Sequence, residues 1–279
     1  MQGKVVVITG GTSGIGQVTA ERLAAMGARI VLVARSKGRG EAALGRLREL
    51  APGREHSVHY GDVSRLADLN RLAAEIRSAE PRIDVLINNA GAMFGTRQVT
   101  EDGMELTFAT NHMSYFVLTH GLREPLAAAG AARVVNTSSH AHYRAKIDFD
   151  DLQSEHNYKA FPVYCFSKLC NILFTRVLAR RLAGTGVTTN SLHPGFVKTR
   201  FGDATGGGMA LTIRLMKLFA ISVEKGAETI IYLASSGDVA KTSGLYFYKC
   251  KPVEPSKLAL DDATAERLWT ETAKLAGIK

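Results

Sequence analysis

The stretch Thr9–Gly16, TGGTSGIG, comes directly after the apolar run KVVVIT at residues 4–9 and opens a stretch of helical period at 15–27. Glycines in such a turn let the backbone come close to a pyrophosphate, and the helix N-terminus supplies unpaired N–H groups and a partial positive charge. Glycines alone are weak evidence, but a strand before and a helix after supply the required context. The sequence therefore predicts a dinucleotide-binding turn whose contacts come from Gly10, Thr12, Ser13, Gly14, Ile15 and Gly16.

Outward from this turn, short runs rich in valine and isoleucine alternate with longer segments of helical period. Nearly continuous apolar strands are typical of sheets covered on both faces, and strand–helix alternation is typical of parallel βαβ units. The sequence thus predicts one α/β domain over residues 1–279, a Rossmann-type doubly wound parallel sheet of about seven strands with helices on both faces. The predicted strands are 4–9, 29–34, 56–60, 83–87, 132–137, 187–192 and 244–248, and the predicted helices are 15–27, 39–50, 64–79, 101–128, 161–183 and 223–235.

Local signals mark several helix ends. Asp62-Val63-Ser64 and Thr100-Glu101-Asp102 predict helix starts, whereas Gly27 and Gly184 predict helix stops. Residues 195–222 break the alternation, because a glycine-rich part precedes an amphipathic stretch at Met209–Ser222. A surface loop with a packed helix is one interpretation. Glycine hinges beyond the carboxyl ends of the strands favour the other, a substrate lid.

Composition excludes several classes of protein. The chain has 279 residues, 46% hydrophobic and 22% charged, which is ordinary for a globular protein and excludes a disordered or fibrous one. The formal net charge of +9 raises the question of polyanionic partners, but no run of five like charges occurs, so no nucleic-acid partner is expected. Three cysteines, Cys165, Cys170 and Cys250, are too few for a disulfide framework or a zinc site and indicate reduced thiols.

Other sequence features bear on location. The sequence lacks a signal peptide pattern at its start and a stretch of 18 apolar residues, so we expect a cytoplasmic protein with no integral membrane segment. The stretch Met209–Ser222 carries two cations among apolar residues, and peripheral contact with a membrane surface is the alternative for it.

The end of the second predicted strand bears on which dinucleotide binds. Sites for NAD commonly place an acidic residue there, on the ribose 2′-hydroxyl. This chain has Ala34-Arg35-Ser36-Lys37 instead, with a cation where a 2′-phosphate would lie. Arg35 offers a planar fork of donors and Ser36 a further hydrogen bond, so the sequence predicts NADP(H) rather than NAD(H).

Motifs over nearly the whole chain resemble the short-chain dehydrogenase/reductase family, in its retinol dehydrogenase-like branch. Each motif is weak alone, but their joint order is specific. The branch is indicated by YCFSKLCNIL at 164–173, by the long gap between Ser139 and Tyr164, and by the ending at 265–269. The family motifs are TGxxxGxG at 9–16, Asp62-Val63, Asn88-Asn89-Ala90-Gly91, Asn111, Ser138-Ser139, Tyr164-x-x-x-Lys168 and His193-Pro194-Gly195.

This resemblance implies further cofactor contacts. Asp62 and Val63 would flank the adenine, and Asn89, Ala90 and Gly91 would pass under the adenosine ribose region. Pro194, Gly195, Val197 and Thr199 would hold the nicotinamide end, with Thr199 near the carboxamide. The family also pairs through helices equivalent to 101–128 and 161–183, which implies a homodimer or homotetramer.

The predicted catalytic pair is Tyr164 and Lys168, which lie four residues apart on one face of a helix. A free tyrosine has a pKa near ~10, and a neighbouring ammonium and an oxidised nicotinamide both favour the phenolate and lower that pKa. Tyr164 would donate a proton to a carbonyl oxygen or accept one from an alcohol. Lys168 would also bind the nicotinamide ribose, as the resemblance implies.

Two further residues complete the predicted tetrad. Ser139 would hydrogen-bond the substrate oxygen, and it is preferred to Ser138 because it matches the family's second serine at the end of that strand. The resemblance gives Asn111 a role in anchoring a water that relays protons to the lysine. A helix-interior asparagine that satisfies a backbone kink is a compatible structural explanation of Asn111.

The predicted substrate is a bulky hydrophobic carbonyl or alcohol, because the loops after the strands offer apolar and flexible side chains. His140, His142 and His193 lack partners at metal-ligand spacing, so no metal is expected, and His140 and His142 are assigned to a loop near the pocket mouth. The predicted substrate-binding residues are Met93, Phe94, His140, Tyr143, Phe196, Phe201 and Met209.

Two other functions stay open on this evidence. A similar Lys-Leu-Cys-Asn run occurs in light-dependent protochlorophyllide reductases, so a light-driven reductase is one alternative. A non-catalytic NADP(H)-binding sensor with the same fold is the other. The presence of Ser139, Tyr164 and Lys168 together favours an enzyme over the sensor.

Overall fold

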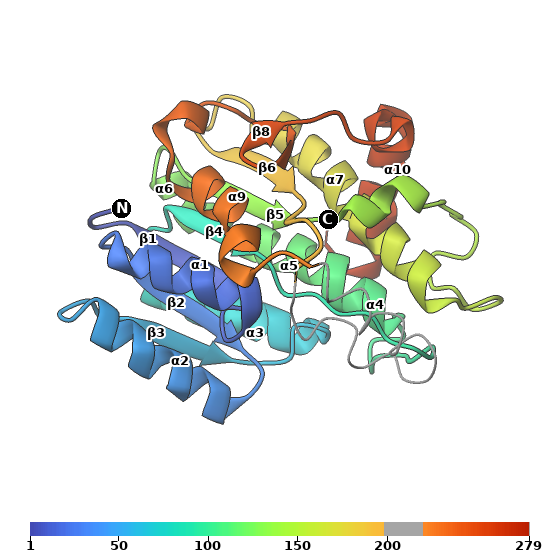
Figure 1. The fold of residues 1–279 in the computed structure, drawn as a ribbon. Coiled ribbons are helices and arrows are strands. Elements are labelled where there is room, and N and C mark those ends of the chain that lie inside the picture. Colours follow the sequence, from blue (N-terminus) through green and yellow to red (C-terminus); the bar gives the residue numbers. More distant parts are fainter. Residues whose placement is uncertain (198–219, 279) are drawn as a thin grey trace.

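A single sheet of order β3-β2-β1-β4-β5-β6-β7-β8 organises the chain (Figure 1), and the computed structural model describes residues 1–197 and 220–278. Strands β1 to β7 pair in parallel, and only β8 is antiparallel to its neighbour. The predicted doubly wound α/β fold is therefore confirmed, with one short strand more than expected. The strands are β1 (Val5–Thr9), β2 (Arg29–Ala34), β3 (Ser57–Tyr60), β4 (Val85–Asn88), β5 (Arg133–Thr137), β6 (Thr188–Leu192), β7 (Tyr246–Tyr248) and β8 (Lys251–Pro252).

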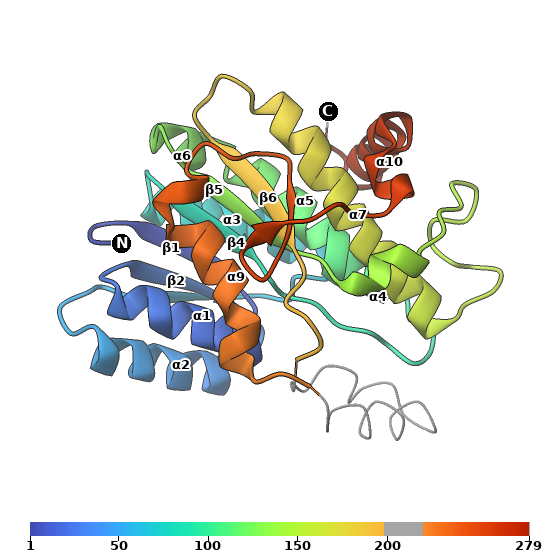
Figure 2. The ribbon, with the colours of Figure 1, turned by 45° about the horizontal axis from the view of Figure 1, so that its top comes forward.

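Helices cover both faces of the sheet, as Figures 1 and 2 show. One face carries α1 (Gly14–Ala25), α2 (Lys37–Leu50) and α9 (Val223–Ser235), and the other carries α3 (Leu66–Ala79), α5 (Ser114–Gly121) and α7 (Ala160–Arg181). Alternate strand residues serve the two cores: Val6 and Ile8 pack under α1, whereas Val7 packs under the opposite helices. The chain order reverses between β1 and β4, so the carboxyl ends of these strands flank the usual ligand crevice of such sheets.

The predicted helix 101–128 is wrong at its start and in its continuity. It begins at α4 (Leu106–Phe108), where the buried Glu105 carboxylate caps the N–H groups of Thr107 and Phe108. A π-helical turn, η1 (Ala109–Met113), then leads into α5, and α6 (Arg123–Ala128) follows separately. The acidic residues predicted to start this helix serve a different one, since the Leu66 N–H at the start of α3 donates to Asp102 Oδ2 at 2.9 Å.

The C-terminal helix α10 (Asp262–Leu275) was not predicted, although its Asp261 cap is a regular start signal. It packs along α7, with Trp269 against Phe116 of α5 and Phe174 of α7 at ring-centroid distances of 4.8 and 5.7 Å. Figure 2 shows α10 beside α7. This helix therefore covers part of the α5–α7 surface through which the resemblance implied pairing.

Other boundary predictions can be compared directly. Gly27 and Gly184 follow the ends of α1 and α7 with φ of +90° and +81°, which confirms both as helix stops. Most of the predicted lid, 195–222, lies outside the described residues, but its two ends meet where the Ile221 N–H donates to the Phe196 carbonyl at 2.9 Å. Among the described residues, no helix is long and apolar enough to cross a bilayer.

Candidate active site

The turn between β1 and α1 is shaped for close approach of a ligand to the backbone. A Cβ on Gly16 would lie 2.2 Å from the Gly10 carbonyl oxygen, so only glycine fits there. Gly10 has φ +68°, a conformation that glycine adopts without strain. Ser13 precedes α1 without a side-chain cap, so the first N–H groups of the helix have no capping side chain. A glycine cradle that ends in uncapped N–H groups fits the pyrophosphate of a dinucleotide.

The loop after β4 is fixed to this turn. The Thr9 hydroxyl accepts hydrogen bonds from the N–H groups of Asn89 and Ala90, each at 3.0 Å. The Asn89 amide in turn donates to the Thr9 carbonyl at 3.2 Å, whereas its buried Oδ1 has no hydrogen-bond partner in the described part of the chain. A buried unpartnered acceptor beside the cradle is a place for a ligand hydroxyl. The loop that begins with Asn89 and Ala90, to which the resemblance assigns cofactor contacts, thus lies beside the glycine turn.

At the other end of the cradle, Arg35 follows β2 and is largely exposed. Its Nη1 lies 3.7 Å from Asp62 Oδ2, which follows β3, because the parallel pair β2–β3 brings both carboxyl ends to one edge. Ser36 caps α2 by accepting from the Arg39 N–H. No acidic residue follows β2, so the donors at this position are a guanidinium, a hydroxyl and a helix N-terminus, which suit a phosphate.

Tyr164 and Lys168 lie one turn apart on the first half of α7, on the carboxyl side of the sheet. Lys168 is almost completely buried, and its Nζ donates to the Thr137 carbonyl at 3.3 Å. The amine lies 5.7 Å from the centre of the Tyr164 ring. Gly91 closes the other side, since a Cβ there would be 3.1 Å from Lys168 Nζ. The predicted pair is thus assembled in one buried place at the end of β5.

Burial dominates the protonation of both groups. It raises the pKa of Tyr164 to about 12, against a smaller lowering from the hydrogen bond with Ser139. It lowers the pKa of Lys168 to about 7. In the protein without cofactor, burial therefore holds the pKa of Tyr164 above its free value instead of the expected lowering, and it also favours the neutral amine of Lys168.

The two serines after β5 have different partners. Ser138 is buried, and its hydroxyl donates to the Lys168 carbonyl at 2.6 Å, so it is used in anchoring α7. Ser139 hydrogen-bonds Tyr164 and accepts from the Ala141 N–H at 3.2 Å. Ser139 is thus the serine that shares a site with the tyrosine, as predicted from its position after the strand.

Asn111 lies in the π-helical turn η1 and is fully buried. Its amide donates to the Ala92 carbonyl and the Ser167 hydroxyl, each at 2.9 Å, and its Oδ1 accepts from the Ala92 N–H at 2.7 Å. The side chain therefore holds the loop that carries Gly91 against α7. The asparagine sits at a helix irregularity, which agrees with the backbone-kink explanation offered from the sequence.

The predicted substrate residues separate into two groups. Met93 packs against Tyr164 and Ala160 in a small apolar cluster, and the Phe94 carbonyl accepts a hydrogen bond from Tyr158 at 2.7 Å. Phe196 and Tyr143 are exposed, although the Tyr143 hydroxyl donates to the Glu254 carbonyl. Phe201 and Met209 lie outside the described residues, as does Thr199 of the predicted cofactor contacts.

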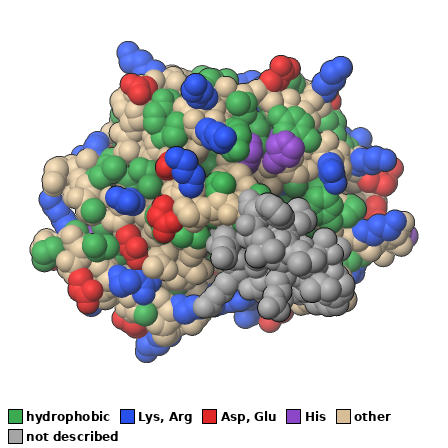
Figure 3. Space-filling view, in the orientation of Figure 1, with side chains coloured by type: hydrophobic (Ala, Val, Ile, Leu, Met, Phe, Trp, Pro, Cys, Tyr) green, Lys and Arg blue, Asp and Glu red, His purple; other side chains and the backbone are tan. Residues whose placement is uncertain are grey.

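The histidines differ from one another. His140 is exposed, with its ring 5.5 Å from that of His193. His142 is buried: one ring nitrogen lies 2.7 Å from the Ser139 carbonyl, and the other accepts from the Ser256 N–H at 3.1 Å. Burial lowers the pKa of both His142 and His193 to about 4. Figure 3 shows histidine side chains that reach the surface among apolar ones, with cations scattered over the same face.

The nicotinamide end of the predicted cofactor site follows β6. Gly195 has φ +87°, and a Cβ there would be 3.0 Å from Ile221 Cδ1. Val197 is buried close to Gly226 of α9 and pairs with Ile221 in a parallel bridge. Pro194 lies between this turn and His193, whose ring stacks on Tyr248 at 4.0 Å.

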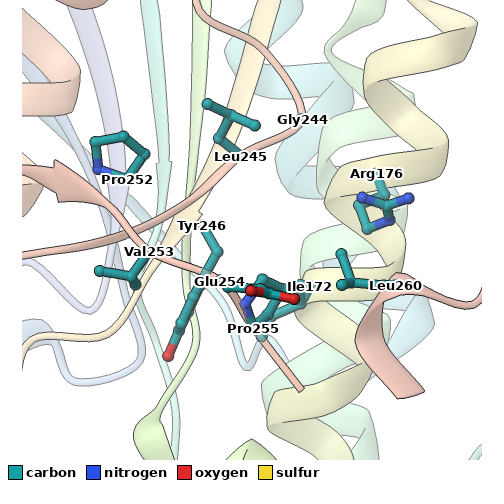
Figure 4. Close-up of a pocket in the computed structure, with 10 residues that line it drawn as sticks. All are labelled: Ile172, Arg176, Gly244, Leu245, Tyr246, Pro252, Val253, Glu254, Pro255 and Leu260. Atoms are coloured by element: carbon teal, nitrogen blue, oxygen red, sulfur yellow. The ribbon is translucent and has the colours of Figure 1, made fainter. Parts of the chain in front are cut away.

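A cavity of about 190 Å³ lies between α7 and the segment around β7 and β8 (Figure 4). Ile172 and Arg176 of α7 line it together with the segment around β7 and β8. None of the predicted catalytic residues lines this cavity, so it belongs to the packing of the C-terminal segment.

Sequence reasoning missed the polar residues that support the site. Tyr115, whose hydroxyl donates to the Ala90 carbonyl at 2.9 Å, and the buried pair His112 and Asn171 were not singled out. Asn171 stands inside the quoted YCFSKLCNIL segment, three residues after Lys168 and so on the same face of the helix. Its spacing was therefore an available signal.

Comparisons with known proteins agree with this geometry. A family model described as short chain dehydrogenase matches residues 4–207. Retinol dehydrogenase 12 of Homo sapiens is 41% identical over 279 residues, covering 100% of this chain and 88% of the relative. Retinol dehydrogenase 13 of Homo sapiens is 40% identical, with 99% and 86% covered.

Solved structures show the same fold. The crystal structure of an uncharacterized protein from Mycobacterium paratuberculosis superimposes with a TM-score of 0.80 at 32% identity, covering 100% of this chain and 95% of the other. An actinorhodin polyketide ketoreductase crystallised with NADPH gives a TM-score of 0.67 at 26% identity, with 88% and 94% covered.

Proposed function

The chain belongs to the short-chain dehydrogenase family, in its retinol dehydrogenase-like branch, and on that premise we propose that it reduces a bulky hydrophobic carbonyl compound with NADPH. The family assignment makes it an oxidoreductase with a nicotinamide cofactor. The observation that carries the finer proposal is the joint placement of Ser139, Tyr164 and Lys168 at the carboxyl end of β5.

The proposed chemistry divides between cofactor and protein. The bound cofactor supplies the hydride that the carbonyl carbon accepts. Ser139 orients the substrate oxygen, and Tyr164 donates its phenolic proton to that oxygen. Because burial raises the pKa of Tyr164 to about 12, the phenol is protonated at neutral pH, which suits reduction more than oxidation. Lys168 binds the ribose and, when charged, stabilises the phenolate left after proton transfer.

The preference for NADPH is supported by the edge that carries Arg35. Its exposed guanidinium and the α2 N-terminus offer donors, and the acidic residue that would repel a 2′-phosphate is absent after β2. Asp62 already lies 3.7 Å from the guanidinium and keeps it at this edge. The related ketoreductase crystallised with NADPH supports the same choice.

A retinoid or similarly apolar aldehyde is the proposed substrate class. Met93 packs against Tyr164, Phe196 exposes an apolar ring after β6, and the curated relatives are named retinol dehydrogenases. Asn111 holds the loop that carries Met93 and Phe94 through its bonds to Ala92. We assign it the support of this loop and of the lysine, within the proton relay that the family resemblance implies.

The decisive test is NADPH oxidation with aliphatic, aromatic, retinoid and steroidal carbonyls, run with wild type and Tyr164→Phe. We expect turnover with the retinoid aldehydes, and a loss of about 10²–10⁴ in kcat for Tyr164→Phe with NADPH affinity retained. Full turnover by Tyr164→Phe would overturn the role of Tyr164. If the wild type binds NADPH but oxidises it with none of these carbonyl compounds, a non-catalytic NADPH sensor would be favoured instead.

Cofactor preference has its own control. Arg35→Ala should weaken NADPH binding by about tenfold or more and leave NADH binding unchanged, because it removes a charge-assisted contact to a phosphate. Arg46→Ala, further along α2 and paired with Glu21 at 3.0 Å, is the matched arginine control. Equal weakening of NADH and NADPH by Arg35→Ala would contradict the assignment.

A further inference from the structure

A continuous row of buried hydrogen bonds joins the C-terminal helix to the lysine of the active site. Thr272 Oγ1 of α10 lies 3.0 Å from His112 Nε2, and His112 Nδ1 lies 3.3 Å from Asn171 Oδ1. The Asn171 amide then reaches the Thr137 carbonyl at 3.2 Å, which is also the acceptor for Lys168 Nζ. The row thus begins on the outermost helix and ends at the amine.

The direction of each hydrogen bond follows from the amide of Asn171. Its Nδ2 donates to two carbonyls, so its Oδ1 is an acceptor and His112 Nδ1 carries the proton. His112 Nε2 is then the acceptor, and the Thr272 hydroxyl is its donor. Burial lowers the pKa of His112 to about 4, so the ring is neutral at neutral pH. The neutral ring has one donor and one acceptor nitrogen, which fixes the direction of both hydrogen bonds.

The members of the row have no access to water. Asn171 and Thr272 are fully buried, and His112 is 1% exposed. A donor or acceptor that loses its partner there keeps its full desolvation cost, so each hydrogen bond holds the next one in place. Thr272 is therefore the point at which α10 enters the row.

Asn171 donates to two carbonyls, one of which also accepts from the lysine amine. One belongs to Thr137 at the end of β5, and the other belongs to Asn111 in the π-helical turn, at 2.9 Å. Gly91, which nearly touches Lys168 Nζ, also lies against Asn111. The titratable groups that face the amine are the rings of Tyr164 and Tyr115, at 5.7 and 5.9 Å.

We propose that Thr272, His112 and Asn171 are positioning residues, through which α10 fixes the Lys168 amine for turnover. The proposal rests on the proposed function, since it is there that the amine serves the reaction. Its consequence is that α10 contributes to catalysis, although Thr272 itself contacts none of the predicted catalytic side chains.

The test compares two threonines on α10. Thr272→Val removes the hydroxyl from the row, and Thr272→Ser keeps it. Thr270→Val makes the same change at an exposed position, where the hydroxyl donates to the Glu266 carbonyl of its own helix. We expect about a fivefold lower kcat for Thr272→Val with an unchanged KM, and wild-type kinetics for the other two. A lowered melting temperature with intact kcat would mean a merely structural role and would overturn the proposal.

A second measurement does not depend on turnover. In protein labelled with ¹⁵N-lysine, Asn171→Leu should move the titration midpoint of Lys168 to higher pH, because the Thr137 carbonyl is then left to the ammonium alone. An unchanged midpoint in the folded variant would contradict the proposal. Absence of carbonyl reduction by the wild type would instead contradict the proposed function, and the two failures are therefore separable.

Discussion

The two faces of the sheet differ in how their cores are made. Under α1, α2 and α9 the buried cluster is almost entirely aliphatic, with side chains such as Ile8, Leu23 and Ile87. Under α3, α5 and α7 the strands change from apolar to polar residues toward their carboxyl ends, from Leu86 to Asn88 and from Val134 to Asn136. The second face therefore has a polar layer just before the active site begins.

This polar layer is internally bonded. The Asn88 amide donates to Asn136 Oδ1 at 2.9 Å, and the Asn136 amide donates to Thr175 and Thr189 at 3.0 and 3.2 Å. Directional bonds fix positions more closely than aliphatic contacts, which tolerate some repacking. The face under α1, α2 and α9 thus stabilises the fold around the backbone turn proposed to bind the cofactor. The face under α3, α5 and α7 fixes the side chains proposed to transfer protons.

The largest expected effect comes from Lys168→Met, which replaces the buried amine with an apolar side chain of similar length. We predict a kcat lower by about 10²–10⁴, since the phenolate formed at Tyr164 loses its partner charge. Steady-state kinetics at saturating NADPH would measure this loss. A variant with wild-type kcat would show that the polar face does not serve catalysis.

The same variant has a defined effect on stability. Between about pH 7 and about pH 10, Lys168 stays protonated in the unfolded chain. In the folded chain its pKa is lowered to about 7, so it releases the proton over the same range. The unfolded state then binds more protons, so the free energy of unfolding gains up to about 1.4 kcal/mol per pH unit from this residue as pH rises. Urea unfolding should show that gain in wild type relative to Lys168→Met, and parallel pH curves would contradict it.

The same contrast explains what the sequence could predict. The apolar runs and the turn at Gly10–Gly16 are local patterns, so strands and turn follow from spacing, whereas Tyr164 and Lys168 were assigned as the catalytic pair because they stand in order with the other family motifs. The row from Thr272 to Asn171 joins positions far apart in the chain, and nothing in the local pattern around Thr272 marks it as buried. The π-helical turn was missed for the same reason, because the buried Glu105 cap and the contacts of Asn111 with Ala92 decide it.

A matched pair of core variants should separate the faces further. Leu23→Ala and Asn136→Leu should each lower the free energy of unfolding by about 3 kcal/mol, the first through a cavity and the second through amide and hydroxyl groups left without partners. Only Asn136→Leu should also lower kcat, because the adjacent Thr137 carbonyl holds Lys168. Urea titrations and kinetics on both variants would measure this. Equal losses of kcat at a temperature where both are folded would remove the distinction.

The smallest effect on stability is expected from substitution of Trp269. This α10 residue packs on the outer side of α5 and α7, the helices that cover the polar layer. Its ring packs on Phe116 and Phe174, and the Arg181 guanidinium lies 4.5 Å from its centre. We predict that Trp269→Ala lowers the free energy of unfolding by about 2 kcal/mol, because the ring is only partly buried.

Trp269→Ala also tests pairing through α5 and α7. With α10 in place, the part of these helices that carries Phe116 and Phe174 is covered, so wild type should not associate through it. Loss of the Trp269 ring exposes Phe116 and Phe174 and should cause concentration-dependent association in sedimentation, whereas Leu275→Ala, at an exposed position of the same helix, should not. A wild-type dimer that Trp269→Ala dissociates would show the reverse, that α10 forms the interface itself rather than taking the place of a partner.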